Sequence, residues 1–422
     1  MGLNDTAWEK LFDRYRILDE VQQKGAFIIS ASQIRAFREP RLMTKFDHRT
    51  NRPRLFGDHN LSILPITRGD YIISSFSAYQ ELTAPAQNVQ KISIPAHLQS
   101  LMPQFLVSEA IALNCASACG ILHDFLGEEE LLPTVHGRMG SGCFDFDIHT
   151  DWGRKTISVK QAQIEIDATY EGIHSLALFE AKRNLCHDFL IRQLYYPFRL
   201  WSQRVNKPIK PVFFVFSNGT FHLYQYQFTD PQHYNSLTLV KQKSYALATE
   251  IVRADMEQLL RTVPLNPEPS IPFPQANRMD RMINLMELLH EKPMTKQEIT
   301  SRYAFDERQT NYYSDAGRYL GLMEKKEGHL LIQLSDCGHR IMNLGHRERQ
   351  LGIAAQILRH KVFHDTFKLY LQRGNIPDRE TIVQIMKGSQ LYHVEADQTY
   401  FRRASTVVGW VKWMAGLMQM PE

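Results

Sequence analysis

Residues 263–274 carry five prolines in twelve positions, in the sequence VPLNPEPSIPFP. Each proline removes a backbone N–H donor, fixes φ and disfavours a helix at the residue before it. A stretch of this kind favours extended backbone. We therefore predict a semi-rigid linker over residues 263–275, which confines regular structure to the sequence on either side of it.

The sequence has a different character on the two sides of this linker. Short apolar runs alternate with helical patterns before it, and helical patterns predominate after it. We expect an α/β fold first, a mixed sheet flanked by helices, and then a mainly α part. The predicted division is an N-terminal α+β region at 1–100, a core at 101–262, the linker, a three-helix module at 276–345 and a second helical unit at 346–422.

The composition is that of an ordinary globular protein, with 43% apolar residues and a formal net charge of +4. No run approaches the roughly 18 apolar residues of a membrane helix, and the N-terminus lacks the apolar core of an export signal. The five cysteines are scattered without zinc-ligand spacing. We therefore expect a cytoplasmic protein in a reducing compartment, with no membrane partner.

Local patterns locate several elements of the first part. Asn218-Gly219, between two β-rich runs at 211–228, predicts a hairpin. A long helix is expected at 105–127, with Ser108 as its N-cap. The other expected elements are two strands and a turn at 61–79, a Gly-rich loop at 137–142, strands at 143–148, 157–167 and 175–182, and a helix at 186–205.

The Gly-rich loop GRMGSG, at 137–142, superficially resembles a phosphate-binding loop. It lacks the Lys-Ser/Thr pair of such a loop and does not stand between a strand and a helix. We therefore expect no nucleotide partner.

The residues with the clearest chemical meaning lie at 164–198. Alternate side chains of a strand share a face, so Glu165 points with Asp167, and Glu180 points with Lys182. If the strands that end in Asp167 and Lys182 pair through a loop near Glu171, two carboxylates and one ammonium converge at one end of a sheet. The alternative is an exposed ion pair on an edge strand, but the apolar run at 176–179 favours a buried strand.

That set of groups suits the hydrolysis of a phosphodiester. Hard carboxylate oxygens such as those of Asp167 and Glu180 can bind one or two Mg²⁺ ions. A bound Mg²⁺ activates water and neutralises phosphate charge, and Lys182 can contact the charge that develops. The pattern therefore predicts a magnesium-dependent hydrolase acting on DNA.

The order of Asp167, a short insert and the strand ending Glu180-Ala181-Lys182 resembles the PD-(D/E)xK nuclease superfamily, with Ile166 where the motif usually has proline. The resemblance implies metal ligation by Asp167, Glu180 and the carbonyl of Ala181, with Lys182 as a catalytic residue. In some members a helix after the motif and an earlier helix add polar groups. Two further residues resemble these catalytic additions: Gln193 and Glu109.

Longer segments resemble type II restriction endonucleases. These are REPRLMTKFDHRTNRPRLF with LSILPITRGDYIISSF at 38–76, SEAIALNCASACGILHDFL at 108–126, and the motif segment itself. Together they cover most of residues 26–228. The resemblance implies that the chain cuts double-stranded DNA at specific sequences.

A local basic patch lies at 33–54, with only two acidic residues, Glu39 and Asp47. Arginine is suited to phosphate and to guanine, so we predict contact with DNA; a solvated basic loop is the alternative. The predicted DNA-binding residues of this patch are Arg35, Arg38, Arg41, Lys45, Arg49 and Arg52.

The part after the linker begins with three expected helices and a β-hairpin. Thr295 and Glu298 form a capping box, Asp306 is a plausible N-cap, and the third helix should end near Leu320. Helices followed by the hairpin at 323–335 resemble a winged helix-turn-helix module, although a protein–protein module has the same outline. Tyr313, Ala316 and Leu320 should face its core, while the residues expected to face DNA are Arg308, Asn311 and Arg318 on the third helix and Lys325, Lys326 and His329 in the wing.

The last helical segment, at 399–414, carries Arg402 and Arg403, which we expect to reach DNA phosphates. Trp410 and Trp413 share an apolar stripe and should lie in the core.

We therefore expect a sequence-specific, Mg²⁺-dependent type II restriction endonuclease that hydrolyses phosphodiester bonds of double-stranded DNA. The alternatives are a repair or mobile-element nuclease and a non-catalytic winged-helix regulator. Only one candidate active site is visible in the sequence, and cutting both strands needs two sites acting together or one site acting twice. A homodimer or a partner subunit would supply a second site, and nicking is the alternative if neither forms. The predicted linker also suggests cleavage displaced from the recognised sequence.

Overall fold

The computed structural model describes residues 3–85, 88–95, 97–101, 106, 108–183, 185–247, 251–302, 307–325, 331–392 and 394–418. The chain divides into two compact units. The first comprises Met1–Leu98, Leu106–Phe216 and Thr220–Ala246, and the second comprises Gln99–Phe105, Ser217–Gly219 and Leu247–Glu422. Mixed α/β structure with a large mixed sheet and a helical C-terminal region is as the sequence predicts. None of the described helices is long and apolar enough to cross a membrane.

The first unit begins with short helices packed on a three-stranded antiparallel sheet of order β1-β3-β2. Trp8, Phe12 and Phe56 meet edge to face in their core, and the Trp8 indole donates to the Met43 carbonyl at 3.0 Å. These elements are α1 (Leu3–Tyr15), α2 (Ile17–Lys24), β1 (Phe27–Ser30), α3 (Ala31–Arg35), α4 (Pro40–Met43), α5 (Arg54–Asp58), β2 (Ser62–Pro65) and β3 (Asp70–Ser74).

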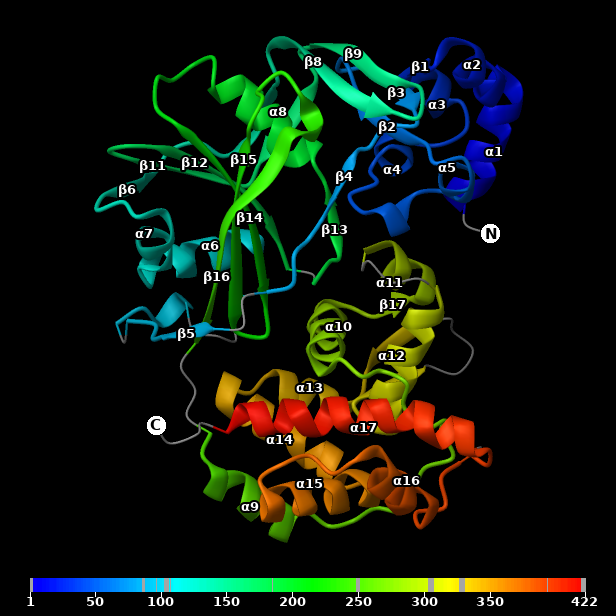
Figure 1. Ribbon diagram of the computed structural model, residues 1–422, viewed down its shortest axis with the longest axis vertical. Helices are drawn as coiled ribbons and strands as arrows, with labels where there is room; N and C mark the ends of the chain where they lie inside the picture. Colours follow the sequence, from blue (N-terminus) through cyan, green and yellow to red (C-terminus); the bar gives the residue numbers. More distant parts are fainter. Residues whose placement is uncertain are drawn as a thin grey trace. The chain divides into compact units, whose positions relative to one another are not determined.

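A seven-stranded mixed sheet forms the centre of the first unit (Figure 1). β12 runs parallel to β14 and antiparallel to β11. In order across the sheet, the strands are β5 (Val89–Ile92), β16 (Leu237–Leu247), β15 (Thr220–Phe228), β14 (Ile209–Ser217), β12 (Leu176–Lys182), β11 (Ala168–Gly172) and β6 (Leu131–Pro133).

Helices cover the sheet on both sides, with α8 (Arg192–Trp201) on one side and α6 (Glu109–Ala118) and α7 (Ile121–Leu126) on the other (Figure 1). The first six of the seven residues of β12 are buried, as expected for a strand covered on both faces. Three further pairs of strands complete the unit: β7 (Gly137–Gly140) with β10 (Gln163–Ile166), β8 (Cys143–Thr150) with β9 (Gly153–Lys160), and β4 (Tyr79–Glu81) with β13 (Asp188–Leu190).

Local signals located some of these elements correctly. Asn218 and Gly219 both have positive φ, 51° and 71°, as a two-residue hairpin turn of type I′ requires. The Ser108 hydroxyl accepts from the Ile111 amide at 3.2 Å and so caps α6. The hairpin and the cap are confirmed.

Other predictions about local structure were wrong. The helix expected at 105–127 is broken at Gly120, whose φ of 74° ends α6 and starts α7. The expected loop at 137–142 contains strand β7, because β10 pairs with it. The strand expected at 157–167 is interrupted by Gln161, with φ of 55°, and the helix expected from 186 starts only after β13.

The second unit is mainly helical. The capping box is present: the Thr295 hydroxyl accepts from the Glu298 amide at 3.1 Å, and Glu298 accepts from the Thr295 amide at 2.8 Å. Its elements are α9 (Arg253–Thr262), α10 (Met279–Glu291), β17 (Met294–Thr295), α11 (Lys296–Arg302), α12 (Glu307–Tyr319), β18 (Met323–Lys325), β19 (Leu331–Leu334), α13 (Asp336–Met342), α14 (His346–Leu358), α15 (Lys361–Arg373), α16 (Arg379–Lys387) and α17 (Asp397–Leu417).

The core of the second unit is built from α10, α12, α14, α15 and α17. Tyr313 and Ala316 of α12, and Leu320 just after it, are buried, as predicted. Trp410 is fully buried and stacks on Phe363, whereas Trp413 is only partly buried at the edge of the core.

The proline-rich stretch is bound to this second unit. Phe273 is buried and stacks on Phe363, with ring centroids 5.6 Å apart. Glu268, which precedes Phe273 in the same stretch, accepts a hydrogen bond from the Tyr319 hydroxyl at 2.5 Å. Contacts with the rest of the second unit therefore hold this stretch, for which the prolines predict extended backbone.

Candidate active site

The pairing of β11 with β12 places Asp167 beside Glu180. Ala168 lies opposite Phe179 in this antiparallel pair, so the preceding residue, Asp167, comes level with Glu180. The Asp167 carboxylate Oδ2 accepts from the backbone N–H of Ala181 at 2.7 Å. The predicted convergence of Asp167 with the Glu180-Ala181-Lys182 strand is therefore present.

Glu180 and Lys182 lie on the face of β12 that α8 covers. The ammonium of Lys182 is 2.5 Å from Glu180 Oε1, and both side chains are buried, with 16% and 9% of their surface exposed. The amide of Gln193, on α8, donates to the same oxygen at 2.5 Å. Gln193 thus touches the site, as the sequence predicts, and Glu180 Oε1 receives two donors.

Burial dominates the electrostatics of these carboxyl groups. Desolvation raises the pKa of Glu180 to about 8, although Lys182 opposes the shift. Desolvation also raises the pKa of Asp167, against the pull of Lys182 and the Ala181 amide. For Lys182, burial favours the neutral amine, but Glu180 and other carboxylates outweigh it and raise the pKa of the ammonium. The site is therefore a cluster of buried carboxyl groups around one lysine ammonium.

Glu109 lies at the first position of α6, and its carboxyl is within electrostatic range of Lys182 and Asp167. Burial raises its pKa, and the neighbouring Asp167 raises it further, while Lys182 lowers it. The structure thus brings Glu109 near the other predicted site residues, although no hydrogen bond joins it to them among the described residues.

Asp47 is a residue that the sequence analysis missed. Its side chain is 19% exposed and lies 3.7 Å from the ammonium of Lys45. Burial would raise the pKa of Asp47, but Lys182, Lys45 and Arg192 outweigh burial and lower it. The sequence offered one signal, an acidic residue inside an otherwise basic segment. Nothing in the local pattern connects it with a strand more than a hundred residues away.

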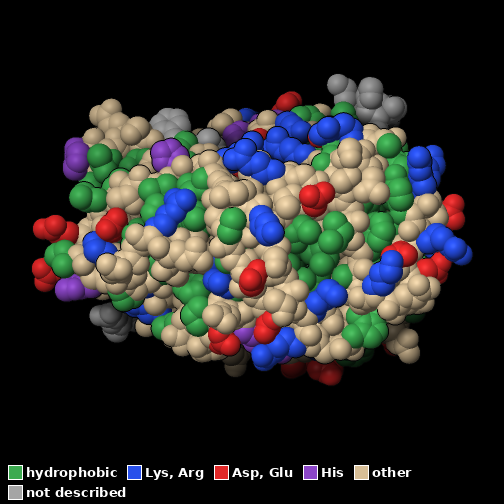
Figure 2. Space-filling view, turned by 90° about the horizontal axis from the view of Figure 1, so that it is seen from above, with side chains coloured by type: hydrophobic (Ala, Val, Ile, Leu, Met, Phe, Trp, Pro, Cys, Tyr) green, Lys and Arg blue, Asp and Glu red, His purple; other side chains and the backbone are tan. Residues whose placement is uncertain are grey.

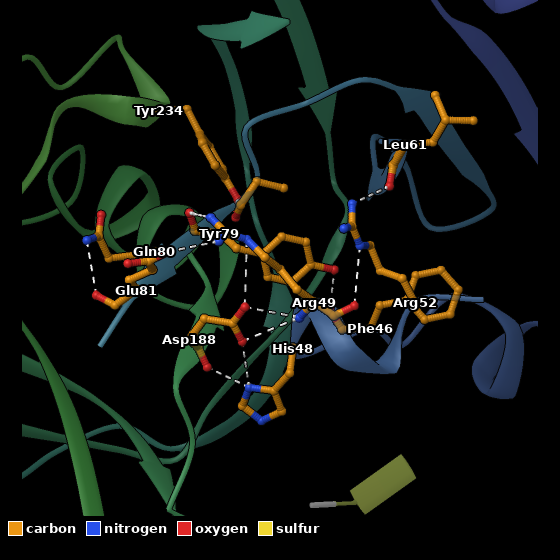
Figure 3. Close-up of polar contacts among 11 residues, drawn as sticks. Phe46, His48, Arg49, Arg52, Leu61, Tyr79, Gln80, Glu81, Asp188 and Tyr234 are labelled. Carbon is orange, nitrogen blue, oxygen red and sulfur yellow. Dashed lines mark hydrogen bonds and ion pairs between the residues drawn. The ribbon is translucent and has the colours of Figure 1, made fainter. Parts of the chain in front are cut away.

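The segment that carries Asp47 is fixed to β13, just before α8. The Leu190 amide donates to the Asp47 carbonyl at 3.1 Å. The His48 ring Nδ1 donates to the Asp188 carbonyl at 2.6 Å and the Arg49 amide donates to the Asp188 carboxylate at 3.2 Å. Figure 3 shows Asp188 lying between His48 and Arg49, with Tyr79 and Arg52 beside them.

The side chains of this site could hold a divalent cation only if water or a substrate supplied further ligands. Among the residues that the structure describes, no three His, Cys, Asp or Glu side chains are grouped closely enough to hold a metal by themselves. Mg²⁺, however, is usually bound through one or two carboxylates, with water and substrate phosphates supplying the rest. Gln193 Oε1 is buried without a hydrogen-bond partner among the described atoms. Two desolvated carboxyls and an unsatisfied acceptor suit a hydrated cation.

The predicted basic patch separates into two groups. Arg49 and Arg52 are tied to the protein: Arg49 pairs with Asp188 and Glu81, and Arg52 donates to the Leu61 carbonyl at 3.1 Å and lies over the Tyr79 ring. The other four predicted residues are exposed or half-buried: Arg35, Arg38, Arg41 and Lys45. Apart from Lys45, which lies 3.7 Å from Asp47, the second group is the part of the patch available to a ligand.

Basic side chains are unevenly spread over the surface. Figure 2 shows one face of the molecule, on which Lys and Arg side chains gather in a band while acidic side chains are scattered. The modest net charge therefore coexists with locally positive surface.

In the second unit, α12 carries the predicted DNA-facing residues. Arg308 is exposed and its guanidinium donates to the Tyr312 hydroxyl at 2.6 Å, while Asn311 is half-buried. Arg318 pairs with Asp315 at 3.1 Å, and Lys325 lies 3.4 Å from the same carboxylate. Asp306, Lys326 and His329 lie outside the described residues.

On α17, Arg402 is exposed and Arg403 is half-buried. Desolvation and Arg402 lower the pKa of Arg403, while Tyr312 raises it. The tyrosine that binds Arg308 is therefore also close to Arg403.

Three protein families match successive parts of the chain, and each is described as a domain of unknown function. DUF6996 matches residues 5–73, DUF6997 matches residues 74–246 and DUF7226 matches residues 281–419. The second match contains Glu109, Asp167, Glu180, Lys182 and Gln193, whereas Asp47 lies in the first. No curated protein and no solved structure matches the chain. These similarities divide the chain into three parts and attach no activity to any of them.

Proposed function

We propose that this protein is a Mg²⁺-dependent endonuclease of the restriction type, with its catalytic centre at the end of β12. The observation that carries the proposal is the Asp167–Ala181 hydrogen bond, because it brings a second carboxylate to the Glu180–Lys182 pair. A buried cluster of this kind is costly unless a cation compensates it. The sequence order of these residues resembles the PD-(D/E)xK nucleases, and the proposed core is of that type.

Each residue of the centre has a proposed task. Asp167, Glu180 and the Ala181 carbonyl would hold the Mg²⁺, which when bound lowers the pKa of water and neutralises phosphate charge. Lys182, charged because carboxylates surround it, would contact the phosphate oxygen on which negative charge develops. Gln193 holds Glu180 in place through its amide N–H, and its free carbonyl oxygen can accept from a water molecule.

Glu109 has an auxiliary role in this proposal. Its carboxyl is within electrostatic range of Lys182, and burial raises its pKa. Such a group can take up or release a proton near the reacting water.

We further propose that residues 276–345 form a winged-helix module that binds double-stranded DNA. The order α10-β17-α11-α12-β18-β19 and the sheet order β17-β19-β18 support this proposal. In such a module the helix before the wing enters the major groove. The side chains of α12 that would then read or contact DNA are Arg308, Asn311 and Arg318, and Arg402 and Arg403 of α17 would contact phosphates.

The proposal is tested by incubating the protein with mixed-sequence plasmid DNA, with Mg²⁺ or with a chelator. We expect discrete fragments with Mg²⁺, no cleavage with chelator, and loss of cleavage in both Asp167→Ala and Glu180→Ala. The matched control is Glu165→Ala, which removes an exposed carboxylate two residues from Asp167 that pairs with Arg138. Undiminished cutting by either site variant would refute the proposed centre.

A further inference from the structure

The last turn of α6 brings two thiols together. Cys115 and Cys119 are free cysteines, and the Cys119 amide donates to the Cys115 carbonyl at 2.9 Å. Side chains four residues apart on a helix lie on the same face. The two sulfur atoms are 3.9 Å apart, within hydrogen-bond range of each other. The helix therefore holds a pair of reduced thiols in contact.

The two thiols differ in their access to solvent. Cys115 is completely buried, whereas Cys119 is partly exposed and follows the exposed residue Ala118. A small solute can therefore reach Cys119 from solution, and it meets Cys115 only through Cys119.

The contact between the thiols also separates their reactivity. The hydrogen bond with Cys115 lowers the pKa of Cys119, although burial opposes the shift. The same hydrogen bond and burial together raise the pKa of Cys115. The thiolate is the reactive form of cysteine, so Cys119 is the member of the pair that reacts first.

The end of α6 is a place where a disulfide can close. The α-carbons of residues four apart on a helix are separated by about 6 Å, and disulfides span about 4.4–6.8 Å. The sulfur atoms would have to approach from 3.9 Å to about 2 Å. Cys119 is the C-cap of the helix, and Gly120 leaves the helical conformation with a φ of 74°. Closure therefore changes only a terminal turn.

We propose that Cys115 and Cys119 form a redox modification site, which a hydroperoxide converts into a disulfide within α6. The Cys119 sulfur attacks the peroxide, whose O–O bond breaks. Cys119 is oxidised to a sulfenic acid, and the peroxide is reduced to an alcohol or to water, which takes up the thiol proton. The Cys115 sulfur then attacks the Cys119 sulfur: the S–S bond forms, the S–O bond breaks, and the hydroxyl leaves with the Cys115 proton as water.

This inference does not depend on the proposed nuclease function. In the reducing compartment expected from the sequence, such a disulfide would be transient, as is usual for disulfides that sense oxidants. The competing explanation is that the two thiols only fill space between α6 and its neighbours.

The test treats the reduced, full-length protein with hydrogen peroxide, unfolds it in urea with iodoacetamide to alkylate every remaining thiol, and digests it with trypsin. The tryptic peptide 92–138 contains Cys115 and Cys119 and no other cysteine. By mass spectrometry, we expect this peptide to lose both alkylation sites together and to become lighter by two hydrogen atoms. Dithiothreitol should restore both sites.

Three variants separate the two steps. In Cys115→Ala, Cys119 should stop at the sulfenic acid, which dimedone traps. In Cys119→Ala, Cys115 should keep its alkylation site after peroxide treatment. The control is Cys143→Ala, which removes an exposed cysteine of β8 and should form the disulfide as the wild type does.

Two alkylated cysteines in the wild-type peptide after peroxide treatment would overturn the inference. Oxidation of Cys119 alone, to an acid that dithiothreitol does not reverse, would also overturn it, and so would loss of the Cys115 site in Cys119→Ala. The wild-type result needs no variant to fold, and thermal unfolding before treatment checks each variant. Because the readout is thiol chemistry, failure of this inference leaves the proposed nuclease function standing, and the converse holds.

Discussion

The carboxylate of Asp167 accepts a hydrogen bond from the backbone amide of Ala181, 2.7 Å away. Ala181 stands between Glu180 and Lys182, so this single bond fixes Asp167 against the two residues with which it is proposed to act. The bond follows from the antiparallel register of β11 and β12, in which Ala168 faces Phe179. The backbone thus determines the arrangement, and the side chains determine its charge.

Asp167→Asn should abolish cleavage and preserve the fold. The amide oxygen of asparagine can still accept from Ala181, but the negative charge that would hold a cation is lost. We expect the cleavage rate to fall on the order of 10²-fold or more, as for other groups that stabilise charge in a transition state. DNA affinity, measured by fluorescence anisotropy in Ca²⁺, should stay within a few-fold of wild type. A variant that cuts at half the normal rate would exclude Asp167 from the centre.

Gln193→Ala should slow cleavage less than a substitution that removes a carboxylate of the site does. The substitution removes the donor that orients Glu180, and also the buried acceptor proposed to bind water. The loss of a group that orients a metal ligand typically costs about 10–100-fold. Single-turnover cleavage rates provide the measurement, and Gln203→Ala, which changes an exposed glutamine just after α8, is the control. Equal rates for the two variants would show that Gln193 only packs against the site.

Arg308→Ala should weaken DNA binding without affecting catalysis at saturating DNA. Arg308 is exposed on α12, where the proposed winged-helix module would present it to DNA. Loss of one phosphate contact should reduce the slope of log affinity against log salt by about one. The comparison is Arg373→Ala, an exposed arginine at the end of α15. If affinity and salt slope are the same in both variants, α12 does not face DNA.

The second unit should lose stability in acid through His360. Its ring is buried and stacks on Tyr319, and burial lowers its pKa to about 4. In the unfolded chain the pKa is about 6.5, so between these values the unfolded state binds more protons. The free energy of unfolding therefore falls as the pH decreases through this window, by about 1–2 kcal/mol from pH 7 to pH 5.

Urea unfolding at pH 7 and pH 5 measures this loss in the wild type and in His360→Phe, which keeps the ring stacking. Burial raises the pKa of the nearby Glu268, which contributes in the opposite direction and remains in both proteins. The variant should lose less stability than the wild type over this range. Parallel losses would assign the acid sensitivity to other groups.

Features encoded by neighbouring residues could be predicted from the sequence. Asn218-Gly219 specifies its turn through the positive φ that both residues adopt, and Thr295 caps a helix three residues from its partner, Glu298. The convergence of Asp167 with Glu180 was also accessible, because one short loop connects the paired strands.

Features that depend on distant partners could not be predicted. Gly137–Gly140 becomes a strand only because β10 supplies its hydrogen bonds. Arg49 pairs with Asp188 and Glu81, two partners that lie far from it in the sequence. The backbone carbonyl of Asp47 is bound by the Leu190 amide, and no local pattern encodes that contact.

The most direct measurement is to sequence the fragment ends after a plasmid of known sequence is digested with the protein and Mg²⁺. The proposed function predicts ends at a fixed offset from one recurring sequence, and it predicts no such ends with Glu180→Ala. An intact plasmid, or the same ends produced by Glu180→Ala, would contradict it.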